Sequence, residues 1–110
     1  MEHLRKNYDF KSVYSKRKSY SDKYYIMYIS ENSLGFNRLG ISVSKKVGNS
    51  VVRHRITRLV REGYRLHEEM FNSGLDIVVV GRNAAASVSY SETVNALLHL
   101  GKKLNILKDV

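Results

Sequence analysis

The sequence predicts an α+β fold, an α/β sandwich in which helices pack on a mixed sheet, with the element order αβββαβα. Three observations lead to this prediction. Residues 51–70 repeat apolar side chains at helical spacing, residues 23–29 and 38–44 are rich in β-forming side chains, and residues 75–80 are apolar without interruption. A strand, a helix and a strand in succession form a βαβ unit, which favours layers of helices and sheet.

Length and composition narrow the class of protein. The chain has 110 residues and 43% hydrophobic content, which suits one folded domain spanning residues 1–110. Cysteine is absent, so neither a disulfide nor a thiolate metal site can form. No apolar run is long enough to span a bilayer, and residues 1–8 have no signal-peptide core. We therefore expect a cytoplasmic protein with no membrane partner.

The first half of the chain predicts one helix and three strands. Asn7 can cap a helix over residues 7–16, with Phe10, Val13 and Tyr14 on one face. Residues 17–22 are polar and suit a turn with a short edge strand. The strands 23–29 and 38–44 are joined by about eight residues, a spacing typical of an antiparallel hairpin.

The second half predicts two amphipathic helices around a buried strand. Asn49 or Ser50 caps the helix over residues 51–70, and the arginines lie opposite its apolar stripe. That stripe consists of Val52, Ile56, Leu59, Gly63, Leu66 and Met70. The apolar run 75–80 is typical of a central strand in parallel pairing. Ser89 and Glu92 form a capping-box pattern, which starts a last helix that ends near residue 107.

Positive charge is concentrated on the first of these helices. The net charge is +9, and residues 45–65 contain one acid against the basic residues Lys45, Lys46, Arg53, Arg55, Arg58, Arg61 and Arg65. A solvated helix face usually mixes both signs, because like charges one turn apart repel. A single-sign arginine face therefore predicts a polyanion partner, with bidentate contacts to phosphate.

Aromatic side chains predict a second surface. Phe10 and Tyr14 share a face of the first helix, while Tyr28 and Ile26 share a face of a strand. If that helix lies over the sheet edge, these side chains can line a groove in which unpaired bases stack. Core packing explains the same spacing, and the sequence alone does not decide between the two.

Motifs for catalysis by the protein itself are absent. The histidines at positions 3, 54, 67 and 99 lack metal-ligand spacing, and no P-loop or nucleophile elbow occurs. His54 stands apart from the others because it lies inside the arginine run. We expect no small-molecule substrate and no cofactor bound by the protein alone.

The stretch from Gly40 to Glu62, which includes SVSKKVGNSVVRHR, closely resembles the signature of the bacterial ribonuclease P protein. Residues 9–14, 75–80 and 90–92 resemble other motifs of that family, so the resemblance covers nearly the whole chain. Two positions depart from the family pattern: His54 replaces the usual Asn, and Thr57 replaces a usual Lys. The loss of a lysine charge is expected to weaken RNA binding slightly.

This resemblance implies a fold, a partner and two sets of binding residues. The implied fold is ribosomal protein S5 domain 2-like, with a four-stranded mixed sheet and a left-handed βαβ crossover. The implied contacts to ribonuclease P RNA are Lys45, Lys46, Asn49, Arg53, His54, Arg55, Arg58, Arg61 and Arg65. The implied contacts to the 5′ leader of precursor tRNA are Phe10, Tyr14, Ile26, Tyr28 and Ser42.

The resemblance also implies a reaction, the endonucleolytic hydrolysis that gives mature tRNA its 5′ end. The RNA subunit is expected to be the catalyst and to require Mg²⁺, while the protein binds RNA and substrate. The residues alone leave other functions open. These are a ribosomal or assembly RNA-binding protein, a nuclease that needs no RNA subunit, and a membrane-surface protein.

Overall fold

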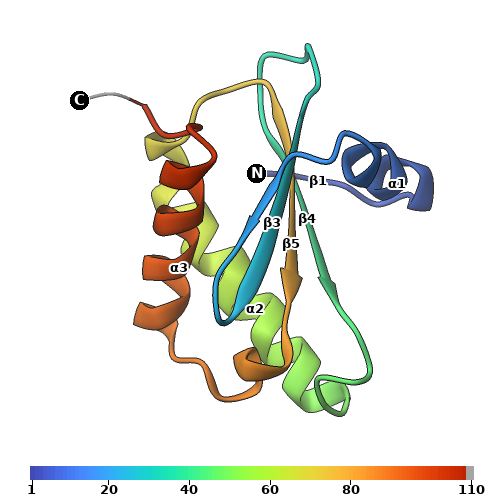
Figure 1. The fold of residues 1–110 in the computed structure, drawn as a ribbon, viewed down its shortest axis with the longest axis vertical. Helices are drawn as coiled ribbons and strands as arrows, with labels where there is room; N and C mark the ends of the chain where they lie inside the picture. Colours follow the sequence, from blue (N-terminus) through green and yellow to red (C-terminus); the bar gives the residue numbers. More distant parts are fainter. Residues whose placement is uncertain (109–110) are drawn as a thin grey trace.

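The computed structural model describes residues 1–108, and in it a β-sheet lies between two layers of helix (Figure 1). Helix α1 (Asn7–Ser15) covers one face of the sheet, whereas α2 (Ser50–His67) and α3 (Tyr90–Lys103) cover the other. The strands are β1 (Glu2–His3), β2 (Ser19–Ser21), β3 (Tyr25–Glu31), β4 (Arg38–Val43) and β5 (Leu75–Gly81). Short 3₁₀ helices cover Glu68–Met70 and Asn83–Ser87. The predicted α+β sandwich is confirmed.

The sheet has five strands rather than four, in the order β1-β4-β5-β3-β2. The additional strand is β1, which pairs in parallel with the start of β4. It is only two residues long and consists of polar side chains, so the sequence carries no alternating pattern that predicts it. The left-handed crossover between β4 and β5 stays a prediction.

The expected hairpin between the second and third predicted strands is wrong. Strand β5 lies between β3 and β4, antiparallel to the first and parallel to the second. Leu75 to Val79 are all buried, and only the middle of the sheet covers both faces of such a strand. The gain from burying both faces of β5 therefore decides the strand order, although the short connection between β3 and β4 would allow them to pair with each other.

Helix α2 begins as predicted, but its buried face is rotated from the predicted stripe. The Asn49 side chain accepts a hydrogen bond from the Val52 N–H at 3.0 Å, so Asn49 is the cap. The buried positions are Ile56, Val60, Gly63 and Tyr64. Leu66 and Met70 from the predicted stripe are exposed, and the α-helix ends at His67.

The predicted N-terminal cap of α3 is confirmed, and the predicted cap of α1 is wrong. Ser89 and Glu92 form the predicted capping box of α3, with hydrogen bonds of 3.1 and 3.0 Å. Helix α1 begins at Asn7, and its N-cap is Lys6, which makes no side-chain capping bond. Asn7 is therefore the first helical residue and not the cap.

Two hydrophobic clusters lie on opposite faces of the sheet. The main core packs α2 and α3 on Tyr25, Met27, Ile29, Leu39, Ile77 and Val79. A smaller cluster of Leu4, Val13 and Val78 lies under α1. The small cluster covers only part of the sheet face on which α1 packs. Other side chains on that face of the sheet therefore remain accessible beside α1.

A buried amide joins the start of β4 to β5 and α2. The Asn37 side chain donates to the Tyr64 hydroxyl at 2.9 Å and to the Asn72 carbonyl at 2.8 Å. It also accepts from the Leu75 N–H at 2.9 Å. Burial raises the pKa of Tyr64 to about 12, so this hydroxyl stays protonated. These bonds fix the end of the sheet away from the β4–α2 turn.

Candidate nucleic-acid interface

Strand register sets three rows of side chains on the face that α1 covers. Ile26, Val80 and Ser42 are partners across β3, β5 and β4, and they form the first row. The second row is Tyr28, Val78 and Gly40, and the third is Ser30, Asp76 and Arg38. Because side chains alternate along a strand, all three rows point to the same side as α1.

The third row is closed by charge pairing. The Arg38 guanidinium donates to both carboxylate oxygens of Asp76, at 2.9 and 2.7 Å, and Asp9 of α1 lies 4.0 Å away. The neighbouring carboxylates raise the pKa of Arg38, with the hydrogen bond to Asp76 as the largest cause. This bidentate pair ties β4 to β5 and fixes the start of α1 above them.

The second row is covered by α1 itself. Val13 is fully buried against Val78, and the Phe10 ring lies directly on Gly40. A Cβ atom at Gly40 would lie 2.7 Å from two ring carbons of Phe10, closer than real carbon contacts allow. Glycine at this position therefore lets α1 approach the sheet closely.

The first row, Ile26, Val80 and Ser42, is not covered by α1, and two tyrosine side chains lie beside it. The rings of Tyr14 and Tyr28 meet edge to face, with centroids 4.8 Å apart and an interplanar angle of 75°. Burial raises the pKa of Tyr14, and the neighbouring Ser42 hydroxyl opposes part of that shift. Ile26 is half-buried and belongs to neither hydrophobic cluster. We call this open row with its two tyrosines the α1 groove.

The structure brings the predicted leader-binding residues together around the α1 groove. Ile26 and Ser42 lie in its floor, Tyr14 and Tyr28 form its wall, and Phe10 anchors the helix that carries Tyr14. Sequence reasoning missed Val80, which lies between Ile26 and Ser42. It also missed the hydroxyl side chain of Ser21, which pairs with Ile26 from β2. Only the strand order reveals these neighbours.

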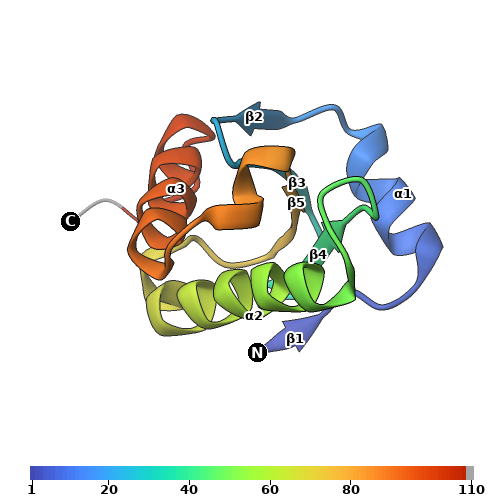
Figure 2. The ribbon, with the colours of Figure 1, turned by 90° about the horizontal axis from the view of Figure 1, so that it is seen from below.

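The predicted RNA-facing residues occupy the turn after β4 and the exposed side of α2. Lys45 and Lys46 are exposed in the turn, which lies between α1 and the start of α2 (Figure 2). His54, Arg58 and Arg61 are exposed on α2, and none of them forms an ion pair within residues 1–108. Ser42 of the α1 groove is three residues from Lys45, so the two surfaces adjoin at this turn.

Three of the predicted RNA-facing residues make side-chain hydrogen bonds within the protein, and a fourth is half-buried. Asn49 caps α2, and the Arg55 guanidinium donates to the Val88 carbonyl, which ties α2 to the segment before α3. Arg65 pairs with Glu62 at 2.6 Å, and this hydrogen bond raises the pKa of Arg65. Arg53 is half-buried, and its Nε atom has no hydrogen-bond partner among the described residues. The free cationic surface is thus smaller than the sequence suggests.

Comparisons with known proteins decide the family. A family model described as Ribonuclease P matches residues 1–105. The chain belongs to the ribonuclease P protein family. A ribonuclease P protein component of Lachnoclostridium phytofermentans is 55% identical over 106 residues, which cover 96% of this chain and 91% of that protein. The corresponding protein of Clostridium botulinum strain Langeland is 45% identical and covers 94% of each chain.

Solved structures of ribonuclease P proteins share the fold. The Staphylococcus aureus protein superimposes with a TM-score of 0.89 at 33% identity, over 98% of this chain and 99% of that chain. The Thermotoga maritima protein gives a TM-score of 0.85 at 31% identity, over 94% and 97% of the two chains. This agreement makes the chain a protein subunit of ribonuclease P, a tRNA-processing enzyme.

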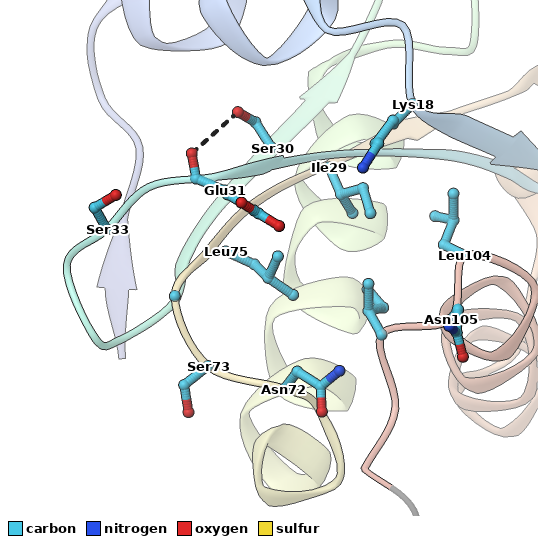
Figure 3. A pocket seen from close by; sticks show the side chains of 12 residues that line it. Lys18, Ile29, Ser30, Glu31, Ser33, Asn72, Ser73, Leu75, Leu104 and Asn105 are labelled. Carbon is cyan, nitrogen blue, oxygen red and sulfur yellow. Dashed lines mark hydrogen bonds between the residues drawn. The ribbon is translucent and has the colours of Figure 1, made fainter.

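A separate pocket in this ribonuclease P protein lies at the other end of the sheet. Its lining comes from the end of β3, the segment before β5 and the residues that follow α3 (Figure 3). Lys18 and Glu31 carry opposite charges there, and Asn72 and Asn105 add polar groups. Within residues 1–108, no predicted RNA-binding or leader-binding residue lines this pocket. The pocket therefore lies apart from the α1 groove and from the predicted RNA-facing residues.

No helix within residues 1–108 combines the length and the apolar character needed to cross a bilayer. In the same residues, no three His, Cys, Asp or Glu side chains gather as ligands for a metal ion.

Proposed function

We propose that the α1 groove binds the single-stranded 5′ leader of precursor tRNA, while the cationic surface of α2 binds ribonuclease P RNA. The observation that carries this proposal is the open row Ile26–Val80–Ser42 beside the edge-to-face pair of Tyr14 and Tyr28. Unpaired bases stack on such rings with little regard to sequence, at about 1–3 kcal/mol per base. A leader that differs from one tRNA to another requires this tolerance.

The charge distribution supports separate roles for the two surfaces. The α1 groove has hydroxyl and apolar side chains. On α2, the exposed Arg58 and Arg61 have no acid partner among residues 1–108. Cations of this kind bind the RNA backbone by releasing its counterions, so they bind strongly and with little sequence preference. Lys45 and Lys46 lie between the two surfaces and can contact either RNA.

The chemistry of the reaction belongs, in this proposal, to the RNA subunit. Metal-activated water hydrolyses one phosphodiester and leaves a 5′-phosphate on the tRNA. The required Mg²⁺ is assigned to the RNA because no three His, Cys, Asp or Glu side chains gather within residues 1–108. The protein binds the leader and holds the substrate in position. Precursor tRNA is transcribed in the cytoplasm of bacteria, so the protein is expected to act there.

Leader binding also separates substrate from product. Mature tRNA has lost the segment that the α1 groove holds, so the product loses that binding energy at the moment of cleavage. One stacked base corresponds to roughly 5- to 150-fold in affinity. The protein is thus expected to favour precursor tRNA over mature tRNA within the holoenzyme.

Reconstitution tests this proposal directly. A precursor tRNA is incubated with a bacterial ribonuclease P RNA at low Mg²⁺ concentration, with and without the protein. The expected result is accurate 5′ cleavage only when both subunits are present. Cleavage by the protein alone, or no stimulation by the protein, would overturn the assignment. The ratio of affinities for precursor and mature tRNA then measures the contribution of the leader.

A further inference from the structure

The row of side chains in the floor of the α1 groove continues beyond the groove onto β2. Ser42, Val80 and Ile26 lead across β4, β5 and β3, and Ser21 of β2 is the next partner after Ile26. The turn that carries Lys45 adjoins the Ser42 end of this row. A single strand that enters the groove from the RNA-facing side is therefore directed towards β2, at the far edge of the sheet.

A shallow depression joins the α1 groove to β2. Its volume is about 580 Å³, and it is lined by Ile26 and Tyr28 of the groove together with Ser19, Tyr20 and Ser21. All three residues of β2 are exposed. Because β2 is the last strand of the sheet, no described strand pairs with its outer side. The surface is thus continuous from the groove to the sheet edge.

The outer side of β2 offers backbone donors as well as hydroxyl groups. The Lys18 carbonyl and the Asp22 N–H form hydrogen bonds to residues of β3. Because backbone groups alternate along a strand, those of Ser19 and Ser21 point away from the sheet. The hydroxyl groups of the two serines lie on the same side of the sheet as Ile26, which pairs with Ser21. This edge can therefore donate hydrogen bonds to a passing strand.

The Tyr20 side chain lies on the other side of β2, against α3. Its ring meets the His99 ring edge to face, with centroids 6.5 Å apart, and the Lys103 ammonium lies 5.9 Å from its centroid. The Tyr20 side chain is nevertheless 43% exposed. An aromatic ring and a cation are thus presented together at the sheet edge. We call Ser19, Tyr20, Ser21 and Lys103 the β2–α3 surface.

The segment before β2 and the end of α3 add further positive charge. Figure 2 shows β2 between α3 and α1, on the side of the molecule away from α2. Lys18 shares the separate pocket with Glu31, but the two form no salt bridge. Within residues 1–108, the exposed cations of these segments that take part in no salt bridge are Lys16, Arg17, Lys18, Lys102 and Lys103. This cationic surface is separate from that of α2.

Two acids lie at the other end of β2 from these cations. Asp22 accepts from the N–H groups of Tyr24 and Tyr25, both at 2.8 Å, and Glu92 accepts from the Tyr24 hydroxyl at 2.6 Å. That hydrogen bond lowers the pKa of Glu92, so its carboxylate stays charged. Both acids share a depression with His99, which therefore marks the boundary of the cationic part. A phosphate chain is repelled from this end and attracted towards the start of β2.

We propose that the β2–α3 surface binds the part of the 5′ leader that lies upstream of the nucleotides held in the α1 groove. The strand leaves the groove over Ser21 and Ser19, a base stacks on Tyr20, and Lys103 with the neighbouring cations contacts the phosphates. An aromatic ring beside a cationic path suits a single strand of any sequence. This inference rests on the proposed function, because it takes the α1 groove as the leader site.

Leader length tests the proposal in the reconstituted holoenzyme. Affinities are measured for mature tRNA and for precursor tRNAs with leaders of about 4 and about 16 nucleotides, the range of single-strand site sizes in proteins. The wild-type protein is expected to bind the long-leader precursor more tightly than the short-leader precursor. Tyr20→Ala should weaken binding of the long-leader precursor roughly 5- to 150-fold and leave the short-leader affinity unchanged. That unchanged affinity also shows that the variant is folded.

A control variant and the salt dependence make this test specific. Tyr90→Ala, at an exposed tyrosine at the start of α3, should change neither affinity. Lys103→Gln should reduce the slope of log K against log salt concentration by about 0.7 for the long-leader precursor only. The proposal is overturned if the wild-type protein binds both precursors equally. It is also overturned if Tyr20→Ala and Lys103→Gln keep the full advantage of the long leader, or weaken both precursors equally.

Cross-linking identifies the RNA segment at the β2–α3 surface. The chain has no cysteine, so a single cysteine can carry a photo-crosslinker at a chosen position. Lys103→Cys is expected to cross-link to the leader farther from the cleavage site than Ser21→Cys does. A cross-link from position 103 to the RNA subunit instead would overturn the leader as the occupant.

Failure of the proposed function gives a different result from failure of this inference. If Tyr28→Ala does not reduce the preference for the short-leader precursor over mature tRNA, the α1 groove is not the leader site and the proposed function fails. If only the effect of leader length is independent of Tyr20 and Lys103, the α1 groove keeps its role and the β2–α3 surface loses its own.

Discussion

Replacing Gly40 by alanine tests whether close packing of α1 shapes the groove. The new Cβ atom would lie 2.7 Å from Cε1 and Cζ of Phe10, and 3.2 Å from Cβ of Leu4. Ordinary carbon contacts are about 3.5–4.0 Å, so the Phe10 ring must retreat by about 1 Å. Overpacking of this size typically lowers the free energy of unfolding by about 1–3 kcal/mol. For a chain of this length, the melting temperature should fall by roughly 4–12 °C.

The same displacement is expected to reach the α1 groove. Tyr14 lies one helical turn after Phe10, so it moves with the helix and leaves its contact with Tyr28. A loss of about 1 kcal/mol of base stacking corresponds to roughly fivefold weaker binding of the leader. Urea unfolding measures the stability, and the affinities of the holoenzyme for precursor and mature tRNA measure the leader preference.

Gly63→Ala is the matched control for this experiment. Its Cβ would lie 3.3 Å from Leu97 and 3.4 Å from Val94, in the contact between α2 and α3 on the other face of the sheet. This variant is expected to keep the leader preference whatever its effect on stability. If Gly40→Ala keeps both wild-type stability and wild-type leader preference, the packing argument for α1 is refuted.

Three further predictions concern single side chains. Tyr28→Ala is expected to weaken precursor tRNA binding roughly 5- to 150-fold and to spare mature tRNA. Tyr90→Ala, at an exposed tyrosine at the start of α3, is the control, and equal losses for both tRNAs on Tyr28→Ala would contradict the groove. Asn37→Ala removes three hydrogen bonds, two of them buried, and should lower the free energy of unfolding in urea by about 2–4 kcal/mol. A loss below about 1 kcal/mol would refute that estimate. Arg58→Ala should reduce the slope of log K against log salt concentration for RNA binding by about 0.7–0.9. Arg65→Ala should change the slope less because its charge is already paired, and equal changes would contradict this distinction.

Periodicity located α2 and its cap but not the side that it buries. The predicted stripe included Leu66, which is 58% exposed, whereas Tyr64, whose ring carries a hydroxyl group, is buried. Tyr64 can be buried because Asn37 satisfies its hydroxyl, and that partner is 27 residues away in the sequence. A window along the helix contains no information about such a partner.

Strand order was the other feature that local patterns did not determine. The loop after β3 is short enough for a hairpin, yet β5 separates β3 from β4. The uninterrupted apolar run of β5 correctly indicated a central strand, but not which strands flank it. Val80 was missed for the same reason, since its place in the groove depends on pairing with Ile26 and Ser42.

The candidate site was predicted mainly by the family motif. Phe10, Tyr14 and Tyr28 were equally consistent with core packing, and the structure assigns Phe10 to packing while it leaves the two tyrosines beside an open row. Spacing along α2 predicted a uniform cationic face. The contacts of Arg55 and Arg65 are tertiary or local pairings that composition does not reveal.

The central position of β5 has a consequence for how the chain folds. Strands β3 and β4 end at Glu31 and Val43, so both leave the ribosome well before β5, which begins at Leu75. Neither has a long neighbouring strand until β5 is made. The sheet is therefore assembled from contacts that are distant in sequence, and such topologies fold slowly. During that interval β3 can pair only with the three-residue β2, and β4 only with the two-residue β1, so both strands expose unpaired backbone groups. Such exposure is a hazard for aggregation. Hydrogen exchange during refolding should show protection of β3, β4 and β5 appearing together.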